Sequence, residues 1–558
     1  MRDGIKLSAD VYRPDAPGRF PCLLMRTYWD NANAGKVRQA MFFAERGYAV
    51  ALVDVRGRFD SGGDWEPYVN EPRDGYDTQQ WLGSQPWCNG KVGTFGASYD
   101  GFTQLMPAPL HSSYLKCMVP VICQQTNFGH LYNDGVMQLN VVFTAGLFFN
   151  GRTLQPMLAQ AYGGSLQVLN YYDLFRRLPL MTAVDDVVDA PYIKTWMRHD
   201  RYDDYWKSYG IKEKYGEITA PAYFVTGWYD NLLHETWRNF IGFRNQGATE
   251  QVRRNTKIIV GPWTHAINAQ GPNWDADFGE NTHIELNGLH LRWFDYWLKG
   301  TPNGTDTDPP IRIFVMGENR WRSESEWPLA RTQWISYSLA SSGRANSLYG
   351  DGVLSDQEIP QSAATQDRFV YDPNRPVPTL GGSISTHPDL QGPRDRRPVE
   401  RRDDVLIYTS APLAVDTEVT GPVELKLYAA SSAVDTDFTA TLADVYPDGR
   451  AVLIAEGVRG ARYRESLEHP SLIEPGRVYP YTISLWETSN VFKAGHRIRL
   501  EISSSNFPRF ARNQNTGEAF GTSSRIVTAQ QSIFHSRQYP SRLVLPIIRS
   551  PIHAGSAQ

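Results

Sequence analysis

Apolar runs and segments of helical periodicity alternate along the first part of the chain. Residues 21–26, 48–54 and 91–95 form mostly apolar runs of the length of a strand. Between them, residues 36–45 and 75–82 repeat apolar positions about every three to four residues, which is the spacing of a helix. Fully apolar strands that alternate with helices are typical of a parallel sheet covered on both faces. The pattern therefore predicts an α/β domain.

Helical periodicity then dominates a longer stretch, residues 127–216, which is rich in Leu, Met and Tyr and has few β-branched runs. Strand-like runs return at 222–226 and 257–261, and an amphipathic helix follows at 284–298. We interpret this order as an α/β domain that is interrupted by an inserted helical subdomain, the cap, and is then resumed.

A segment rich in Gly, Pro and Asp at 299–310 separates these regions from a different pattern. Short alternating strands between turn residues follow it, and they predict a β-sandwich. The clearest of these strands lie at 311–317, 423–431, 437–449, 497–505 and 541–548. The expected regions are the first part of the α/β domain at 1–126, the helical cap at 127–216, the second part of the α/β domain at 217–325 and the sandwich at 326–558.

Composition excludes several function classes. The chain has 558 residues, of which 12% are aromatic, with 46 Gly and 36 Pro, and this mixture indicates a folded, loop-rich protein rather than a disordered or coiled-coil one. Lys and Arg number 56 against 60 Asp and Glu, for a net charge of −4, and no basic tract is present. A nucleic-acid partner is therefore not expected. No run of about 18 apolar residues occurs, so no membrane partner is expected either.

The start of the chain lacks the apolar run and the cleavage site of a signal peptide, which predicts a cytoplasmic protein. A leader upstream of Met1 would make it a secreted one. The cysteines form no C-x-x-C and pair with no histidine at zinc-finger spacing, so no metal is expected; they are Cys22, Cys88, Cys117 and Cys123.

One serine lies where a nucleophile would be placed. Residues 93–101 read Gly-Thr-Phe-Gly-Ala-Ser-Tyr-Asp-Gly, so a predicted strand runs into Ser98 past small residues and a helix-compatible segment follows. A nucleophilic serine on a strained turn needs such neighbours, and the N–H of Tyr99 would point at a developing oxyanion. The plain G-x-S-x-G pattern is not met, because the second glycine is displaced by one position to Gly101. A simple turn remains the alternative for this segment by itself.

Two further residues complete a catalytic triad in the order Ser, Asp, His. Asp230 follows the predicted strand at 222–226, and His265 follows the one at 257–261. Catalytic loops at the carboxyl ends of strands are the rule in open α/β sheets. Four other histidines are interpreted as packing or surface residues: His130, His199, His290 and His496.

Several segments together resemble the cocaine esterase/X-Pro dipeptidyl-peptidase-like (CocE/NonD) serine hydrolases. They include SADVYRPD, GYAVALVDVRGRFDSGG, WCNGKVGTFGASYDGFTQ, GWYD, GPWTH and GHRIRLEISSSNFPRFARN, and the similarity covers nearly the whole chain. The resemblance implies an α/β-hydrolase domain with an inserted helical cap and a C-terminal jelly-roll β-sandwich. The family's serine motif, G-x-S-Y-x-G, accommodates the displaced Gly101. Asp230 matches the family's acid and His265 its base.

The resemblance also implies a second oxyanion donor, a tyrosine hydroxyl in a loop of the type R-T-P-Y. This chain reads Arg26-Thr27-Tyr28-Trp29-Asp30 there, so a gapless match puts Trp29 at the tyrosine's position. Tyr28 fits if the proline is deleted. We predict that Tyr28 is the donor, because a phenol O–H and an indole N–H differ in reach.

These residues predict a serine esterase that forms an acyl-enzyme and needs no metal or organic cofactor. Aromatic residues near the predicted catalytic loops favour an apolar or aromatic acyl group; they are Trp29, Trp228, Tyr229 and Trp263. The expected partner is a small ester or amide, and the aromatic-rich cap is compatible with a homo-oligomer.

Alternatives with the same triad are an amidase or acylase, an X-Pro peptidase and an α-amino-acid ester hydrolase. An X-Pro peptidase and an α-amino-acid ester hydrolase bind the ammonium group of the substrate through carboxylates. Asp230 is followed here by Asn-Leu-Leu, without an acidic pair, although Glu235 or Asp134 could take that role. An inactive binding scaffold is the alternative from another class.

Overall fold

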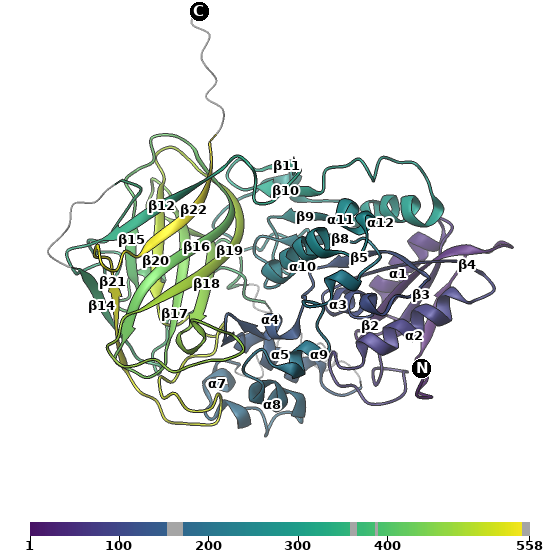
Figure 1. The fold of residues 1–558 in the computed structure, drawn as a ribbon, viewed down its shortest axis with the longest axis horizontal. Helices are drawn as coiled ribbons and strands as arrows, with labels where there is room; N and C mark the ends of the chain where they lie inside the picture. Colours follow the sequence, from purple (N-terminus) through teal and green to yellow (C-terminus); the bar gives the residue numbers. More distant parts are fainter. Residues whose placement is uncertain (153–170, 358–364, 386–388, 550–558) are drawn as a thin grey trace, which may run out of the picture.

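A nine-stranded sheet forms the first half of the computed structural model, which describes residues 1–152, 171–357, 365–385 and 389–549 (Figure 1). The strand order is β1-β3-β2-β4-β5-β8-β9-β10-β11, with parallel pairing from β3 to β10 and antiparallel edge strands. Their bounds are β1 Ala9–Tyr12, β2 Phe20–Thr27, β3 Ala49–Asp54, β4 Cys88–Ala97, β5 Leu115–Val121, β8 Tyr223–Gly227, β9 Lys257–Gly261, β10 Ile311–Val315 and β11 Arg320–Glu324.

Helices cover both faces of this sheet, as the apolar strands predict. Alternate residues of β2 point to opposite faces: Leu23 and Met25 lie in one apolar cluster with residues of α1 and α12, whereas Cys22 and Leu24 lie in another with a residue of α2. The helices around the sheet are α1 Ala34–Ala44, α2 Glu71–Gly83, α3 Tyr99–Leu105, α10 Leu233–Gln246, α11 Glu250–Asn255 and α12 Leu286–Phe294, which continues into a π-helical turn at Asp295–Lys299.

The region between β5 and β8 is mainly helical, as predicted from its periodicity. Its helices are α4 Asn127–Leu131, α5 Leu139–Phe149, α7 Tyr171–Arg176, α8 Pro191–Arg198 and α9 Asp204–Ser208. A short hairpin that the periodicity did not predict, β6 Tyr132–Asn133 and β7 Val136–Met137, interrupts them. Residues 153–170 of the predicted cap lie outside the described part of the chain.

The last part of the chain forms an 11-stranded, largely antiparallel sheet assembly. The main path is β14-β21-β16-β22-β12-β13-β15-β20-β17-β18, and β19 pairs with β16. The strands are β12 Thr332–Ala340, β13 Val353–Ser355, β14 Gln366–Tyr371, β15 Leu406–Thr409, β16 Thr417–Ser431, β17 Asp437–Val445, β18 Ala451–Gly460, β19 Tyr479–Phe492, β20 Arg497–Ser503, β21 Ala529–Phe534 and β22 Arg542–Ile548.

One predicted sandwich strand belongs elsewhere. Residues 311–317 were expected in the sandwich, but β10 pairs in parallel with β9 and extends the first sheet. All residues of β10 except Arg312 are buried, and β11 is the only strand beyond it in that sheet among the described residues. The interpretation of this segment as a sandwich strand is therefore wrong, and the segment lies within the range 217–325 that was expected for the α/β domain.

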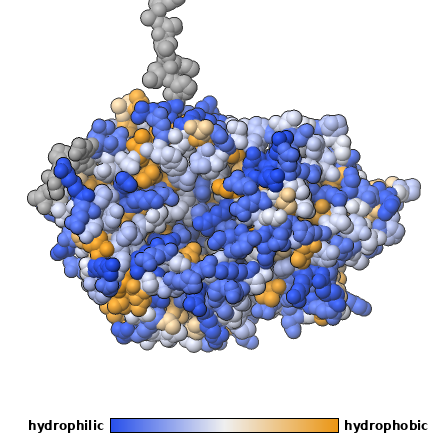
Figure 2. Space-filling view, viewed as in Figure 1, coloured by the Kyte–Doolittle hydropathy of each residue, from blue (hydrophilic) through white to orange (hydrophobic). Residues whose placement is uncertain are grey.

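The helical region contacts the C-terminal domain (Figure 1). The hydroxyl of Tyr463 donates to the backbone carbonyl of Asp200, and the N–H of Met181 donates to the carbonyl of Gly521 at 2.9 Å. Figure 2 shows a mostly hydrophilic face with small apolar groups, as on many folded proteins. Within the described ranges, no helix is long and apolar enough to cross a bilayer.

Candidate active site

The turn between β4 and α3 presents Ser98. Its backbone angles are φ 60° and ψ −122°, a strained conformation that lifts the side chain out of the strand. Gly96 has a φ of +143°, and a Cβ there would lie 2.7 Å from the Cβ of Asp100. A Cβ at Gly101 would lie 2.8 Å from the carbonyl oxygen of Val121. The two glycines are therefore needed because α3 approaches β4 and β5 closely.

Asp230 and His265 follow the neighbouring strands β8 and β9, and the structure brings both to Ser98. The Nε2 atom of His265 lies 3.0 Å from the Oγ of Ser98, and its Nδ1 lies 2.8 Å from the Oδ1 of Asp230. Asp230 is fully buried. The hydroxyl of Thr226 donates to its Oδ2 at 3.0 Å, and the N–H of Leu232 donates to its Oδ1 at 3.2 Å. These bonds fix the carboxylate that orients the imidazole.

Tyr28 and Trp29, the two candidates for the second oxyanion donor, both line the cavity at Ser98. The Tyr28 side chain is buried, and its ring centroid lies 4.4 Å from that of Tyr99. The Nε of Arg58 donates to the backbone carbonyl of Tyr28 at 3.2 Å and holds this loop. Burial raises the pKa of Tyr28 well above its ordinary value, so its hydroxyl keeps the proton that a donor needs.

A buried network anchors Tyr99, the first residue of α3. Its hydroxyl donates to the Oε1 of Glu71 at 2.8 Å and accepts from the N–H of Tyr68 at 3.0 Å. Glu71 forms an ion pair of 2.8 Å with Arg26. Because this network fixes the side chain of Tyr99, it also fixes the direction of the backbone N–H beside Ser98.

A cavity of about 200 Å³ opens over Ser98 and His265. Among the described residues that line it there is no Asp, Glu, Lys or Arg, so the cavity walls carry no permanent charge. The lining residues are Tyr28, Trp29, Trp65, Pro67, Tyr68, Ser98, Tyr99, Gln124, His130, Val141, Thr144, Ala145, Trp196, Asn231, His265 and Ser385. Aromatic side chains from the first sheet's loops and from the helical region thus make up much of the wall.

Three predicted substrate-binding residues do not line this cavity: Trp228, Tyr229 and Trp263. Each is buried and bonds a backbone carbonyl. The indole of Trp228 donates to β10 at 2.7 Å, the hydroxyl of Tyr229 to β18 at 3.1 Å and the indole of Trp263 to residue 282 at 3.1 Å. Their place in the sequence beside the triad therefore reflects packing behind the catalytic loops, and only Trp29 of the predicted four reaches the cavity.

Residues that sequence reasoning missed supply most of the remaining wall. Trp65, Tyr68 and Trp196 lie on a loop and on α8, far along the chain from the triad, and no motif marked them. His130 was interpreted as a packing or surface residue, but it lines the cavity together with His265. Burial, and to a smaller extent the nearby His265, lowers the pKa of His130 to about 3, so its imidazole is neutral near pH 7.

The two carboxylates considered as ammonium ligands lie elsewhere. Glu235 is buried and accepts from the N–H groups of Gln125 and Thr126, each at 3.2 Å. Asp134 forms an ion pair of 3.2 Å with Arg459 of the C-terminal domain. Both line a separate pocket, so neither carboxylate faces the serine.

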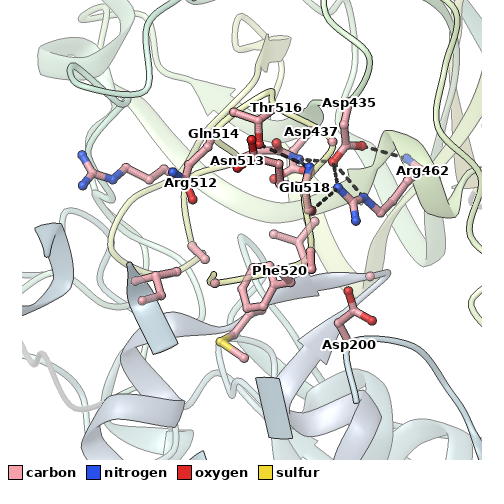
Figure 3. Close-up of a pocket in the computed structure, with 18 of the residues that line it drawn as sticks. Asp200, Asp435, Asp437, Arg462, Arg512, Asn513, Gln514, Thr516, Glu518 and Phe520 are labelled. Atoms are coloured by element: carbon pink, nitrogen blue, oxygen red, sulfur yellow. Dashed lines mark hydrogen bonds and ion pairs between the residues drawn. The ribbon is translucent and has the colours of Figure 1, made fainter. Parts of the chain in front are cut away.

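Another pocket lies between the helical region and the C-terminal domain (Figure 3). Asp435 forms an ion pair of 2.8 Å with Arg462, and the side-chain N–H₂ of Asn513 donates to Asp435 and to Asp437. Burial, with Asp435 beside it, raises the pKa of Asp437 to about 8. These groups bond one another, which indicates a structural role. Across the described ranges, no group of three or more His, Cys, Asp or Glu side chains is arranged to hold a metal.

Comparisons with known proteins identify the family of the chain. The family model of the X-Pro dipeptidyl-peptidase (S15 family) matches residues 3–267, and that of the X-Pro dipeptidyl-peptidase C-terminal non-catalytic domain matches residues 303–544. Cocaine esterase from Rhodococcus sp. (strain MB1 Bresler) is 37% identical over 98% of this chain and 97% of that protein.

Solved structures show the same fold at lower identity. An aminopeptidase from the marine sediment archaeon Thaumarchaeota archaeon superposes with a TM-score of 0.82 at 22% identity, covering 98% of this chain and 95% of that one. An α-amino acid ester hydrolase superposes with a TM-score of 0.79 at 23% identity, with the same coverage of 98% and 95%. The chain belongs to the cocaine esterase/X-Pro dipeptidyl-peptidase-like family of serine hydrolases, enzymes that cleave ester or amide bonds.

Proposed function

We propose that this enzyme hydrolyses carboxylic esters of apolar or aromatic acyl groups through an acyl-enzyme on Ser98. The observation that carries the proposal is the hydrogen-bonded row of Ser98, His265 and Asp230 at the floor of an uncharged, aromatic cavity. In the first step, Oγ of Ser98 attacks the acyl carbon while Nε2 of His265 takes its proton and then gives it to the leaving alkoxide. Asp230 holds the imidazole and stabilises its cation. Water, activated by the same imidazole, then releases the acid.

The oxyanion of each tetrahedral intermediate is stabilised by the N–H of Tyr99 and the hydroxyl of Tyr28. Both residues line the cavity at Ser98, and the raised pKa of Tyr28 keeps its hydroxyl protonated. A preorganised donor in a site that excludes water stabilises a developing charge more than the same donor in water would. Removing one such donor costs about 3 kcal/mol of transition-state stabilisation.

The lining of the cavity supports a neutral substrate. Trp29, Trp65 and Trp196 offer flat apolar surfaces that suit an aromatic ring, and the similarity to a protein named cocaine esterase points the same way. We expect benzoyl and phenylacetyl esters to have a higher kcat/KM than short aliphatic esters of the same alcohol. A higher kcat/KM for acetyl or butyryl esters would contradict the aromatic acyl assignment.

The alternatives with the same triad are an amidase or acylase, an X-Pro peptidase and an α-amino-acid ester hydrolase. A peptidase or an amino-acid ester hydrolase needs a carboxylate near a free amino group, and in this chain Glu235 and Asp134 are bound elsewhere. We therefore expect a phenylacetyl ester to be hydrolysed faster than phenylglycine ester, phenylacetanilide or an X-Pro anilide. A preference for the amino ester or the X-Pro anilide would establish one of those alternatives.

We also propose the finer architecture. The parallel sheet with helices on both faces supports an α/β-hydrolase domain built from residues 1–126 and 217–325, with a helical cap at 127–216. The antiparallel strands support a jelly-roll sandwich at 326–558 that closes one side of the cavity through Ser385. A scaffold without activity would not need the strained turn at Ser98.

A further inference from the structure

Three side chains that line the cavity each have a buried polar atom without a hydrogen-bond partner among the described residues. Gln124 is 1% exposed and Asn231 is 5% exposed, and the side-chain oxygen of each has no hydrogen-bond partner among the described residues. The Nδ1 atom of His130 is likewise buried and without a partner in the described part of the chain. All three side chains line the cavity above Ser98.

Neighbouring residues and elements fix the positions of these three side chains. The side-chain N–H₂ of Gln124 donates to the Oδ1 of Asn127 at 3.0 Å, at the start of α4. His130 lies on the same helix, three residues after Asn127, so the two share a face. Asn231 directly follows the catalytic acid after β8. The polar atoms thus come from two segments, the start of α4 and the loop that follows β8.

A buried polar group without a partner costs about 1 to 3 kcal/mol relative to a bonded one. None of the described polar groups that line the cavity bonds these three atoms, so a group bound in the cavity can supply the missing partner. Because the described lining contains no Asp, Glu, Lys or Arg, nothing there would balance an ion. The partner is therefore a neutral group that can donate and accept hydrogen bonds.

We propose that Gln124, His130 and Asn231 form a polar subsite that binds a hydroxyl or amide group of an otherwise apolar ester. This inference rests on the proposed function and adds a specificity-determining feature to it. The neutral imidazole of His130 offers one donor and one acceptor, which suits a hydroxyl. The hydroxyl can belong to the acyl group or to the alcohol, and the two sources are separable by experiment.

The test uses esters in which a hydroxyl replaces a methyl of equal size. In the acyl arm, ethyl para-hydroxyphenylacetate is compared with ethyl para-methylphenylacetate. In the alcohol arm, hydroxyethyl phenylacetate is compared with propyl phenylacetate. We expect the wild-type enzyme to favour the hydroxyl ester by about ten-fold in kcat/KM in one arm. The arm in which the preference appears identifies which side of the ester meets the subsite.

Variants assign that preference to the subsite. Gln124→Met and Asn231→Leu replace the side-chain amide with apolar groups of nearly the same size, and each is expected to reduce the ratio of kcat/KM for the hydroxyl ester to that for the methyl ester toward one. Asn133→Leu is the matched control, because Asn133 is also 5% exposed with an unpartnered Oδ1 but lies outside this cavity. Because this ratio compares kcat/KM for two esters with the same variant, a general loss of catalysis lowers both values equally and leaves the ratio unchanged.

A second readout keeps the test independent of turnover. Calorimetric titration of Ser98→Ala with the same ester pairs gives the ratio of Kd values without hydrolysis. Equal kcat/KM and equal Kd for hydroxyl and methyl esters in both arms would overturn the polar subsite, as would a preference that both subsite variants retain. If the Kd ratio shows the preference while no ester is hydrolysed by the wild type, the subsite stands and the proposed esterase activity fails.

Discussion

Tyr28 and Trp29 are adjacent residues at the serine, and one substitution at each distinguishes their roles. Tyr28→Phe removes the phenol hydroxyl and retains the ring that packs against Tyr99. We expect kcat to fall about 100-fold or more while KM changes little, because the lost bond forms in the transition state. Trp29→Phe removes the indole N–H and serves as the control. A large fall in kcat for Trp29→Phe together with a nearly normal Tyr28→Phe would assign the donor to Trp29.

The buried carboxylate of Asp230 depends on a neighbour for its orientation. Asp230→Asn preserves size but presents an amide to Nδ1 of His265, which favours the wrong tautomer, so kcat should fall about 10⁴-fold. Thr226→Val removes only the hydroxyl that donates to Oδ2, and we expect a loss of about ten-fold. Steady-state kinetics with a phenylacetyl ester measure both effects. A Thr226→Val loss as large as that of Asp230→Asn would show that this hydroxyl does more than position the carboxylate.

At the scale of elements, the packing of α3 against the sheet sets the position of the nucleophile. A methyl group at Gly101 would meet the Val121 carbonyl, which is backbone and cannot rotate away. Gly101→Ala should therefore destabilise the protein by about 1 to 3 kcal/mol and reduce activity sharply. Gly90→Ala, on the same strand β4, is the control, because a Cβ at residue 90 has no described atom within 4 Å. This variant measures only the loss of stability that a side chain at a positive φ causes. Thermal unfolding and esterase rates of both variants check this, and equal activity losses would contradict it.

Elements of the first domain were predictable from the sequence to different degrees. The strands that precede Ser98, Asp230 and His265 were found, because β4, β8 and β9 each contain a mostly apolar run that is followed by turn residues. The strand β10 was assigned to the wrong sheet, since a short apolar run with one polar residue is compatible with a strand of either sheet. The hairpin of β6 and β7 was missed because two-residue strands have no periodicity to detect.

The cavity wall was less predictable than the triad. Asp230 and His265 follow strands, so the order of the chain brings them together at one edge of the sheet. Trp65, His130 and Trp196 line the same cavity because of how the long loops and the helical region fold. No local sequence pattern predicts that position. Proximity in sequence was misleading for Trp228 and Trp263, which pack behind the loops.

At the scale of the whole molecule, the junction between the helical region and the C-terminal domain contains a titratable carboxyl. Burial raises the pKa of Asp437 to about 8 in the folded protein, far above that of an unfolded chain. The folded state therefore binds the proton more tightly, and the stability that this carboxyl contributes is lost as the pH rises through about 8. Around it lie Asp435, Arg462 and Asn513 (Figure 3).

Asp437→Asn should weaken the dependence of the protein's stability on pH. We expect the melting temperature of the wild type to fall more steeply between about pH 4 and pH 8 than that of Asp437→Asn, because the amide cannot ionise. Asp435→Asn is the contrasting variant, since it breaks the ion pair with Arg462 and should lower the melting temperature throughout this range. Parallel pH profiles for the wild type and Asp437→Asn would contradict the raised pKa.

Covalent labelling tests the role of Ser98 most directly. The wild-type enzyme is treated with an aryl fluorophosphonate, which mimics the tetrahedral intermediate, and its intact mass and peptide map are measured. We predict one adduct per chain, located on Ser98, with loss of phenylacetyl esterase activity in proportion to labelling, and no adduct on Ser98→Ala. Labelling of another residue with loss of activity, or a Ser98→Ala variant that still hydrolyses the ester at the wild-type rate, would contradict a nucleophilic Ser98.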